Sequence, residues 1–300
     1  MNSVKLEKSN INLPLIGFGP DCLGYVLPRP GNTFMKRVHR KLCRIFLDEP
    51  MYQKAITSSF KIGFRLLDYS ASYGNGCFLQ KALKQAGLKR SELLLTTRIS
   101  NTAQYDNTID EEIENQLKGF QTDYIDILMF HWPVKDHYEE TWLKMIELRN
   151  KGICKCLGVA NCNIHHLQRL YEISGEYPEI NQVEVHPLFS QMELRNFCNE
   201  HGIIIESYSP TARHDDRLYS PRLLNEMSKK YNRSINQLIL RWHIQNGLIP
   251  IIRSWNPEHL KNDFNIFDFE LSIEDMDKIN GLNINSRIRY DPDNCDFHSL

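Results

Sequence analysis

The sequence predicts a (β/α)8 barrel, and three observations support this fold class. Short apolar runs alternate with segments of helical spacing along almost the whole chain. Eight such strand–helix units fit within 300 residues, the length expected of one barrel domain. Polar side chains follow three successive runs, as they do where parallel strands end at one face of a barrel. A doubly wound sheet is the alternative, but no G-x-G-x-x-G motif follows an early strand.

The expected strands are short runs dominated by apolar side chains. They are Leu15–Phe18, Phe64–Leu67, Leu93–Thr97, Ile125–Phe130, Cys156–Val159, Gln182–Val185, Ile203–Glu206 and Ile249–Ile252. Helical spacing is clearest in Gly76–Ala86, Asp110–Phe120, Glu139–Asn150, Ile164–Ile173, Met192–His201 and Ser234–Asn246. A further amphipathic segment, Ser272–Gly281, predicts an extra C-terminal helix outside the barrel. The polar tail 283–300 is expected to wrap the surface or the mouth of the site.

We expect a single domain, residues 1–300, with an insertion at about residues 23–48 between the first strand and its helix. Within this insertion the apolar residues fall on one helical face, and basic residues occupy the remainder. The simplest interpretation is an amphipathic helix that packs over the barrel rim and keeps a solvated basic face. An anionic partner, a membrane surface and a lid that touches a phosphate group are the alternatives.

Composition limits the classes of partner. The formal net charge is −1, with 24% charged and 41% hydrophobic residues, so no global field favours nucleic acid or a membrane surface. The polar start MNSVKLEKSNINLPL lacks the apolar core of a signal peptide, and no run reaches the roughly 18 apolar residues of a membrane span. Eight scattered cysteines form no C-x-x-C pair, so we expect reduced thiols, a cytoplasmic protein and no metal site.

Four side chains that follow three successive strands are candidates for proton transfer. Asp68 and Tyr73 follow the second expected strand, Arg98 ends the third and His131 ends the fourth. Such a set suits the reduction of a carbonyl group, whose oxygen gains negative charge and needs a proton. A nearby cation makes a tyrosine proton easier to release, and a carboxylate holds that cation in place. Each residue alone is more often a cap or an ordinary loop residue, so the combination carries the interpretation.

Seven segments, in order along nearly the whole chain, resemble the aldo-keto reductase family. They are LPLIGFG (13–19), GFRLLDYSASYGN (63–75), DYIDILMFHWP (123–133), GVANCN (158–163), EINQVEVHP (179–187), ESYSP (206–210) and IRSWNPEHLKNDF (252–264). The resemblance implies a (β/α)8 barrel that binds NADP(H) in an extended form, with NAD(H) as the alternative. It also implies that the chain reduces an aldehyde or ketone to an alcohol.

The resemblance assigns roles to the matching positions. Tyr73 would be the general acid, His131 would orient the substrate carbonyl, and Asp68 would anchor the cation. Trp132 would form one wall of the substrate pocket, for which an ordinary core aromatic is the alternative.

The family's cofactor contacts map onto the second half of the chain. Asn161 and Gln182 would bind the nicotinamide carboxamide, and Tyr208 would stack on the nicotinamide ring. The other implied cofactor positions, in the pyrophosphate and adenosine segments, are Ser209, Arg253, Ser254, His259 and Asp263.

Arg98 departs from the family pattern, which has Lys at the end of the third strand. Arginine keeps the positive charge, but its guanidinium is planar and broad and favours a forked grip on a carboxylate, here Asp68. Such a grip would draw the charge off the tyrosine oxygen by about an ångström, and misplacement of that order can cost about a hundredfold in rate. We therefore expect slow catalysis rather than none.

The pyrophosphate loop also departs from the pattern. Asp215 and Asp216 are poor neighbours for phosphate unless they point outward, and Arg213 or Arg217 is needed to compensate. Ala160 replaces the serine expected before the carboxamide-binding asparagine, which removes one expected hydrogen bond.

The adenosine segment and the first strand carry further changes. His259 and Asp263 weaken the electrostatic case for a 2′-phosphate, whereas Arg253 supports it, so NADP(H) is favoured over NAD(H). After the first strand, GFGPDC replaces the usual aromatic wall, and Asp21 predicts a more polar substrate pocket.

Two functions remain after these observations. The first is NADPH-dependent reduction of a small-molecule carbonyl by a monomer or weak dimer. The second is a catalytically weak, reductase-like protein that binds NADP(H) and serves as a redox sensor or an assembly subunit. The presence of both Tyr73 and His131 favours the enzyme, because a scaffold needs neither.

Overall fold

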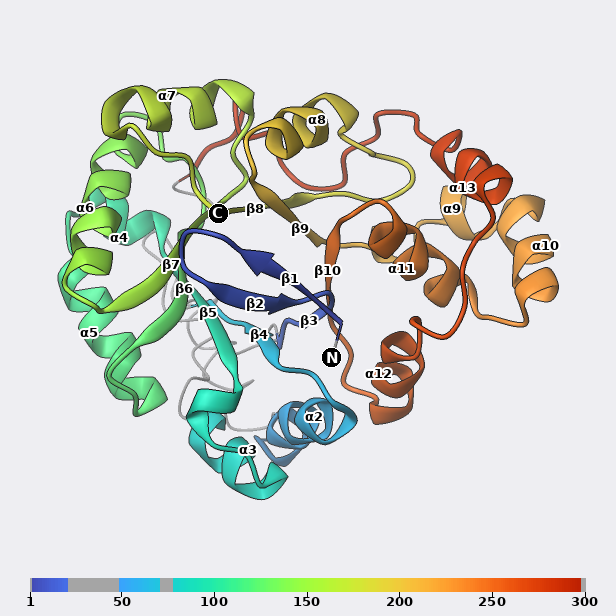
Figure 1. Cartoon of the computed structure of the whole chain (residues 1–300), viewed down its shortest axis with the longest axis horizontal. Coiled ribbons are helices and arrows are strands. Elements are labelled where there is room, and N and C mark those ends of the chain that lie inside the picture. Colours follow the sequence, from blue (N-terminus) through green and yellow to red (C-terminus); the bar gives the residue numbers. More distant parts are fainter. Residues whose placement is uncertain (1, 21–48, 71–77, 298–300) are drawn as a thin grey trace, which may run out of the picture.

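The computed structural model describes residues 2–20, 49–70 and 78–297 (Figure 1). Asp21, Tyr73 and the predicted insertion at residues 23–48 lie outside these ranges.

No helix among the described residues combines the length and the apolar character that a membrane crossing requires. None of the five cysteines in the described ranges is paired with another in a disulfide.

Eight parallel strands close into a barrel, which confirms the predicted (β/α)8 fold. The barrel strands are β3 (Gly17–Phe18), β4 (Leu66–Asp68), β5 (Leu94–Ile99), β6 (Ile125–Phe130), β7 (Cys154–Ala160), β8 (Ile180–Glu184), β9 (Ile204–Tyr208) and β10 (Ile249–Ile252). Neighbours in the barrel follow chain order, and β10 closes it by pairing with both β3 and β9. Each strand overlaps the run that predicted it.

Helices surround the barrel, as Figure 1 shows. Those in the first half are α2 (Glu49–Ile62), α3 (Phe78–Ala86), α4 (Asn101–Tyr105), α5 (Ile109–Phe120), α6 (Tyr138–Asn150) and α7 (Ile164–Ser174), with the 3-10 turn η2 (Arg90–Glu92). Those in the second half are α8 (Met192–Glu200), α9 (Asp216–Tyr219), α10 (Arg222–Tyr231), α11 (Ile235–Gln245), α12 (Pro257–Phe264) and α13 (Ile273–Asn280), with the 3-10 turn η3 (Ala212–His214). The extra C-terminal helix predicted at Ser272–Gly281 is α13, capped by the hydroxyl of Ser272 on the amide of Asp275.

A hairpin that the sequence analysis missed closes one end of the barrel. It pairs β1 (Ser3–Leu6) with β2 (Ile11–Pro14) and crosses the barrel centre in Figure 1. Leu6, Ile11 and Leu13 are buried against the apolar interior, which includes Ile127 and Ile249. The hairpin therefore covers the end of the barrel at which the strands begin.

Strand alternation divides the barrel interior into two chemical layers. Leu66, Ile180 and Ile204 belong to the apolar interior, and the residues two positions later on the same strands are Asp68, Gln182 and Glu206. Near the apolar layer a side chain on Gly17 would have its Cβ 2.5 Å from Cδ1 of Ile251, so a larger residue there would require the Ile251 side chain to shift. The polar layer lies at the carboxyl ends of the strands, where barrels of this type place their sites.

Candidate functional site

A buried ion pair lies at the carboxyl ends of β4 and β5. Nη2 of Arg98 is 2.5 Å from Oδ1 of Asp68, and both residues are at least 95% buried. The pairing predicted from sequence is confirmed, but the forked grip on the carboxylate is wrong. The other arm, Nη1, donates to the backbone carbonyl of Tyr69 at 2.7 Å, so a single arm of the guanidinium contacts the carboxylate of Asp68.

Gln182 connects this pair to the far side of the barrel. Its Oε1 accepts from Nη2 of Arg98 at 2.5 Å, and its Nε2 donates to Asp68 at 3.1 Å and to Glu206 at 2.8 Å. Gln182 and Glu206 are register partners on β8 and β9. In this arrangement both amide atoms are bonded inside the protein. The predicted contact of Gln182 with a nicotinamide carboxamide remains a prediction.

His131 and Trp132 follow β6 at the same face. His131 is half-buried, and its carbonyl accepts from Nδ2 of Asn161 at 2.9 Å. Trp132 is buried, and its ring packs on Phe297 of the C-terminal tail with centroids 6.2 Å apart. Asp68, Arg98 and His131 therefore end three neighbouring strands, as predicted.

Asn161 and Tyr208 form a second bonded pair at this face. The hydroxyl of Tyr208 donates to Oδ1 of Asn161 at 2.7 Å, and Asn161 has a positive φ of 64°. Burial raises the pKa of Tyr208, and the negative charge of Glu184 acts in the same direction. Tyr208 therefore stays neutral at physiological pH and presents an aromatic face and a hydroxyl rather than a charge.

The loop after β9 is conformationally strained. Ser209, Ala212, Arg213 and His214 all have φ between 49° and 62°, the left-handed region that non-glycine residues rarely adopt. Strain of this kind is common where a loop must fit around a ligand.

The structure explains how the two acidic residues of that loop are accommodated. The Arg217 guanidinium binds the carboxylate of Asp215 through Nη2 at 2.7 Å and Nε at 3.0 Å, and its amide binds the same group at 2.9 Å. These hydrogen bonds lower the pKa of Asp215 to about 2. Asp216 is exposed. Arg217 therefore neutralises Asp215, and compensation by Arg213 remains a prediction.

The adenosine segment surrounds the start of α12. Arg253 is exposed, Ser254 is half-buried, and the helix is capped by Asn256. His259 is exposed one turn later, whereas Asp263 is buried. Burial raises the pKa of Asp263 to about 6, and His259 opposes this shift.

The C-terminal tail is fastened to the barrel by Glu184, which the sequence analysis did not single out. Its carboxylate accepts from the amides of Ile288 at 2.6 Å and Arg289 at 2.8 Å, and lies 2.9 Å from Nε2 of His186. Burial raises the pKa of Glu184, but these hydrogen bonds outweigh it and the net shift is downward. A glutamate inside the apolar run NQVEV was the signal that could have identified it.

A histidine cluster holds the tail further along. Nε2 of His165 and of His166 lie 3.2 and 3.6 Å from Oδ1 of Asp293, and Asn163 donates to its Oδ2 at 2.8 Å. By distance alone these groups suit a cation. However, the amide of Asn163 donates to Nδ1 of His166, which places the proton of the neutral ring on Nε2. We therefore assign the cluster to tail anchoring.

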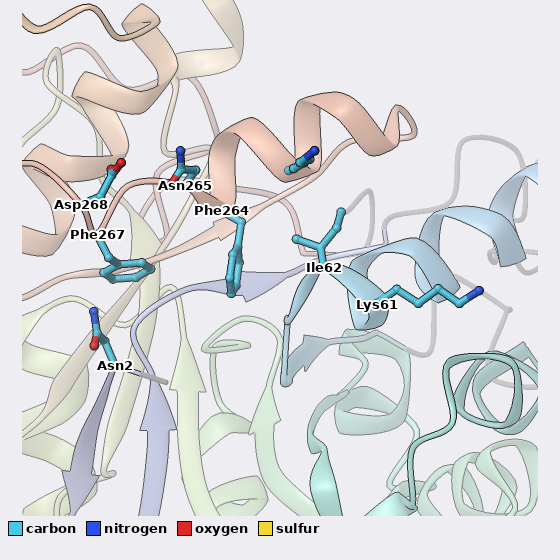
Figure 2. A pocket seen from close by; sticks show the side chains of 8 residues that line it. Asn2, Lys61, Ile62, Phe264, Asn265, Phe267 and Asp268 are labelled. Atoms are coloured by element: carbon cyan, nitrogen blue, oxygen red, sulfur yellow. The ribbon is translucent and has the colours of Figure 1, made fainter.

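A hollow of about 850 Å³ lies at the other end of the barrel (Figure 2). Phe264 and Phe267 line it, with Ile62 on the opposite side and Asn2 below. Ile62 precedes β4, whereas Asp68 ends it, so the hollow is remote from the polar layer. It has no part in the chemistry of Asp68 and Arg98.

Comparisons with known proteins agree with this geometry. The sequence model of the Aldo/keto reductase family matches residues 46–284. Methylglyoxal reductase DkgA of Escherichia coli (strain K12) is 38% identical over 241 residues, which cover 80% of this chain and 87% of that protein. Glyoxal reductase of Bacillus subtilis (strain 168) is 36% identical over 244 residues, which cover 81% of this chain and 88% of that protein.

Solved structures give the same result. MGS-M4, an aldo-keto reductase enzyme from a Medee basin deep-sea metagenome library, superposes with a TM-score of 0.85 at 30% identity, covering 98% of this chain and 100% of that one. A Gox0644 mutant in complex with NADPH superposes with a TM-score of 0.83 at 28% identity, covering 98% of each chain. The chain thus belongs to the aldo/keto reductase family and is an NAD(P)H-dependent oxidoreductase that acts on carbonyl groups.

Proposed function

We propose that this enzyme reduces small aldehydes, and first of all short 2-oxoaldehydes of the kind named for its relatives, methylglyoxal and glyoxal. The observation that carries the proposal is the buried Asp68–Arg98 pair at the carboxyl ends of the strands. Such a pair costs desolvation energy, and a purely structural barrel has no need of it there.

In the proposed reaction Tyr73 donates its hydroxyl proton to the carbonyl oxygen as a hydride reaches the carbonyl carbon. Bound NADPH would supply that hydride, as the NADPH complex of the related Gox0644 mutant supports. The product is an alcohol, and the phenolate left on Tyr73 is stabilised by the positive charge of Arg98 until water returns the proton. His131 donates a hydrogen bond that orients the carbonyl oxygen for this transfer.

The residues that we expect to hold the cofactor fit its chemistry. Asn161 and Tyr208 offer amide groups and a neutral aromatic face for the nicotinamide. The amino end of α12 offers backbone amides for a phosphate, and the exposed Arg253 precedes this helix in the chain. Asp263 opposes a 2′-phosphate once it is ionised. The other expected contacts are Gln182, Ser209, Ser254 and His259.

We expect the rate to be modest, because the guanidinium of Arg98 is shared. It donates to Asp68, to Gln182 and to the carbonyl of Tyr69. Each of these acceptors lowers the positive potential available to the phenol. A lysine ammonium is a compact point charge and would concentrate that potential.

The test follows NADPH absorbance with methylglyoxal, glyoxal and larger aldehydes, for the native chain, Arg98→Lys and Tyr73→Phe. We expect turnover by the native chain, a faster rate with Arg98→Lys and loss of about a hundredfold or more with Tyr73→Phe. Turnover that survives Tyr73→Phe unchanged would show that another group supplies the proton.

The weak NADP(H)-binding alternative is favoured by the same sharing of Arg98. It predicts tight NADPH binding by the native chain and turnover only after Arg98→Lys. The substrate-pocket role of Asp21 and Trp132, the cytoplasmic location and the monomeric or weakly dimeric state remain predictions.

A further inference from the structure

Two buried carboxyl groups lie in the polar layer of the barrel, and they differ in their access to the guanidinium of Arg98. Asp68 is paired with Arg98, but Glu206 has no cation within hydrogen-bond distance among the described residues. Glu206 is completely buried, and its Oε2 accepts from Nε2 of Gln182. Its Oε1 is buried without a hydrogen-bond partner in the described part of the chain. A carboxylate with so few donors is costly to ionise.

The orientation of Gln182 makes it the link between Glu206 and Arg98. A guanidinium can only donate, so the amide oxygen must face Arg98. The amide nitrogen must then face Asp68 and Glu206, which both accept from it. Removing or ionising Glu206 therefore acts on Arg98 through one rigid amide.

Ionisable groups face Glu206 from three strands. Asp68 on β4 opposes its ionisation, Arg98 on β5 favours it, and the thiol of Cys156 on β7 is also coupled to it. Burial raises the pKa of Glu206 to about 8, Asp68 acts in the same direction, and Gln182 and Arg98 only partly offset the two. Glu206 is therefore protonated at neutral pH.

We propose that Glu206 is a positioning residue that must be neutral in the working enzyme, and that its ionisation sets the alkaline limit of carbonyl reduction. An ionised Glu206 adds a second negative charge beside Arg98. That charge weakens the positive potential that Arg98 supplies, and under the proposed function this makes the proton of the general acid harder to release. The catalytic part of this inference rests on the proposed function, whereas the protonation of Glu206 does not.

The first test measures protonation without any substrate. Denaturation midpoints are compared between the native chain and Glu206→Gln from pH 5 to pH 9. An unfolded glutamate loses its proton near pH 4.3, roughly, so between that value and about 8 the folded native chain holds one extra proton. We expect the denaturation midpoint of Glu206→Gln to exceed that of the native chain by an amount that increases with pH across this window and is constant above it.

The second test measures the pH profile of turnover for the same proteins. If the ionised form is inactive, the native rate falls about tenfold from its plateau by pH 9, since roughly one tenth of Glu206 then keeps its proton. Glu206→Gln should have the native rate at pH 7 within about twofold. The alkaline fall in rate, which we call the alkaline limb, should be absent from this variant up to the pH at which Tyr73 itself ionises. If Glu206 had only a structural role, the substitution would leave the pH profile of turnover unchanged.

Glu184→Gln is the matched control, because Glu184 is a buried glutamate on the neighbouring strand β8. The pKa of Glu184 is lowered, so it is ionised throughout the range tested. Its variant should be less stable than the native chain from pH 5 to pH 9, because it loses the charge that holds the tail, and it should leave the alkaline fall in rate in place. Glu206→Met is a second neutral variant in case Glu206→Gln does not fold.

Each outcome decides one part of the proposal. A midpoint difference that stays flat with pH for both neutral variants overturns the protonation of Glu206. If the midpoint difference changes with pH but the alkaline limb is the same in the native chain and in Glu206→Gln, the proposed effect of Glu206 on Tyr73 is overturned. No turnover by the native chain at any pH overturns the proposed function and the catalytic part with it, and the midpoints still decide whether Glu206 holds a proton.

Discussion

Buried carboxylates at the two ends of the barrel differ in the cations and hydrogen-bond donors that surround them. At the end where the strands begin, Asp126 accepts from Arg90 at 2.7 Å, Lys155 at 2.9 Å and the amide of Leu95 at 3.1 Å. At the end where they finish, Asp68 and Glu206 share the amide nitrogen of Gln182, and Arg98 donates to Asp68. Asp126 thus has two cations and one amide as partners, which suits stability. Asp68 and Glu206 have fewer donors between them, so their charge states are more sensitive to a change in one neighbouring group. Such sensitivity is typical of catalytic sites.

The largest effect is expected from breaking the ion pair of the second end. Arg98→Met leaves Asp68 buried without its cation, which should cost about 3–5 kcal/mol of unfolding free energy, and turnover should disappear. Urea denaturation and NADPH oxidation measure the two losses. A stable, active Arg98→Met would show that this pair has neither role.

A matched change at the first end should separate stability from activity. Asp126→Asn keeps the shape but loses the charge that holds Arg90 and Lys155, and should cost about 1–3 kcal/mol. The expected kcat/KM is unchanged, because Asp126 lies at the opposite end from Asp68. A fall in kcat/KM of more than about threefold would contradict the division between the two ends.

A smaller effect is expected where the hairpin is fastened to the barrel. Oε1 of Glu179 accepts from the amides of Lys8 at 2.9 Å and Ser9 at 3.1 Å. Glu179→Gln keeps an acceptor and loses only the charge, so it should cost about 0.5–1 kcal/mol. Hydrogen exchange at Lys8 and Ser9 should accelerate while the rest of the chain is unaffected. Equal acceleration throughout would mean that the hairpin does not open by itself.

The smallest effect is expected on the outer ring of helices, away from both ends. Glu114 and Lys118 form an exposed i,i+4 pair on α5, with both side chains about two-thirds accessible. Lys118→Gln should change the unfolding free energy by at most about 0.5 kcal/mol and leave turnover as it is. A larger loss would indicate that the surface charges of this protein act as a network.

Local patterns were sufficient for the fold. Apolar runs and helical spacing identified all eight barrel strands, because parallel strands buried on both faces must be apolar over their length. The β1–β2 hairpin was missed, although Val4, Leu6, Ile11 and Leu13 alternate with polar residues. Its segments are only four residues long and turn at Asn10, which has a positive φ of 57°, so the pattern is weak.

The sequence by itself determined the barrel, the family and the identity of Asp68, Arg98 and His131 as residues at the ends of neighbouring strands. These follow from chain order and from motifs, which are local. Only the tertiary structure decided how the polar groups are shared. Arg98 and Gln182 are separated by 84 positions, and Glu184 meets Ile288 across 104. Whether Arg98 grips Asp68 alone or spans the barrel, and whether Glu206 finds a cation, depends on closure of the barrel, because only closure brings β5 and β8 within reach.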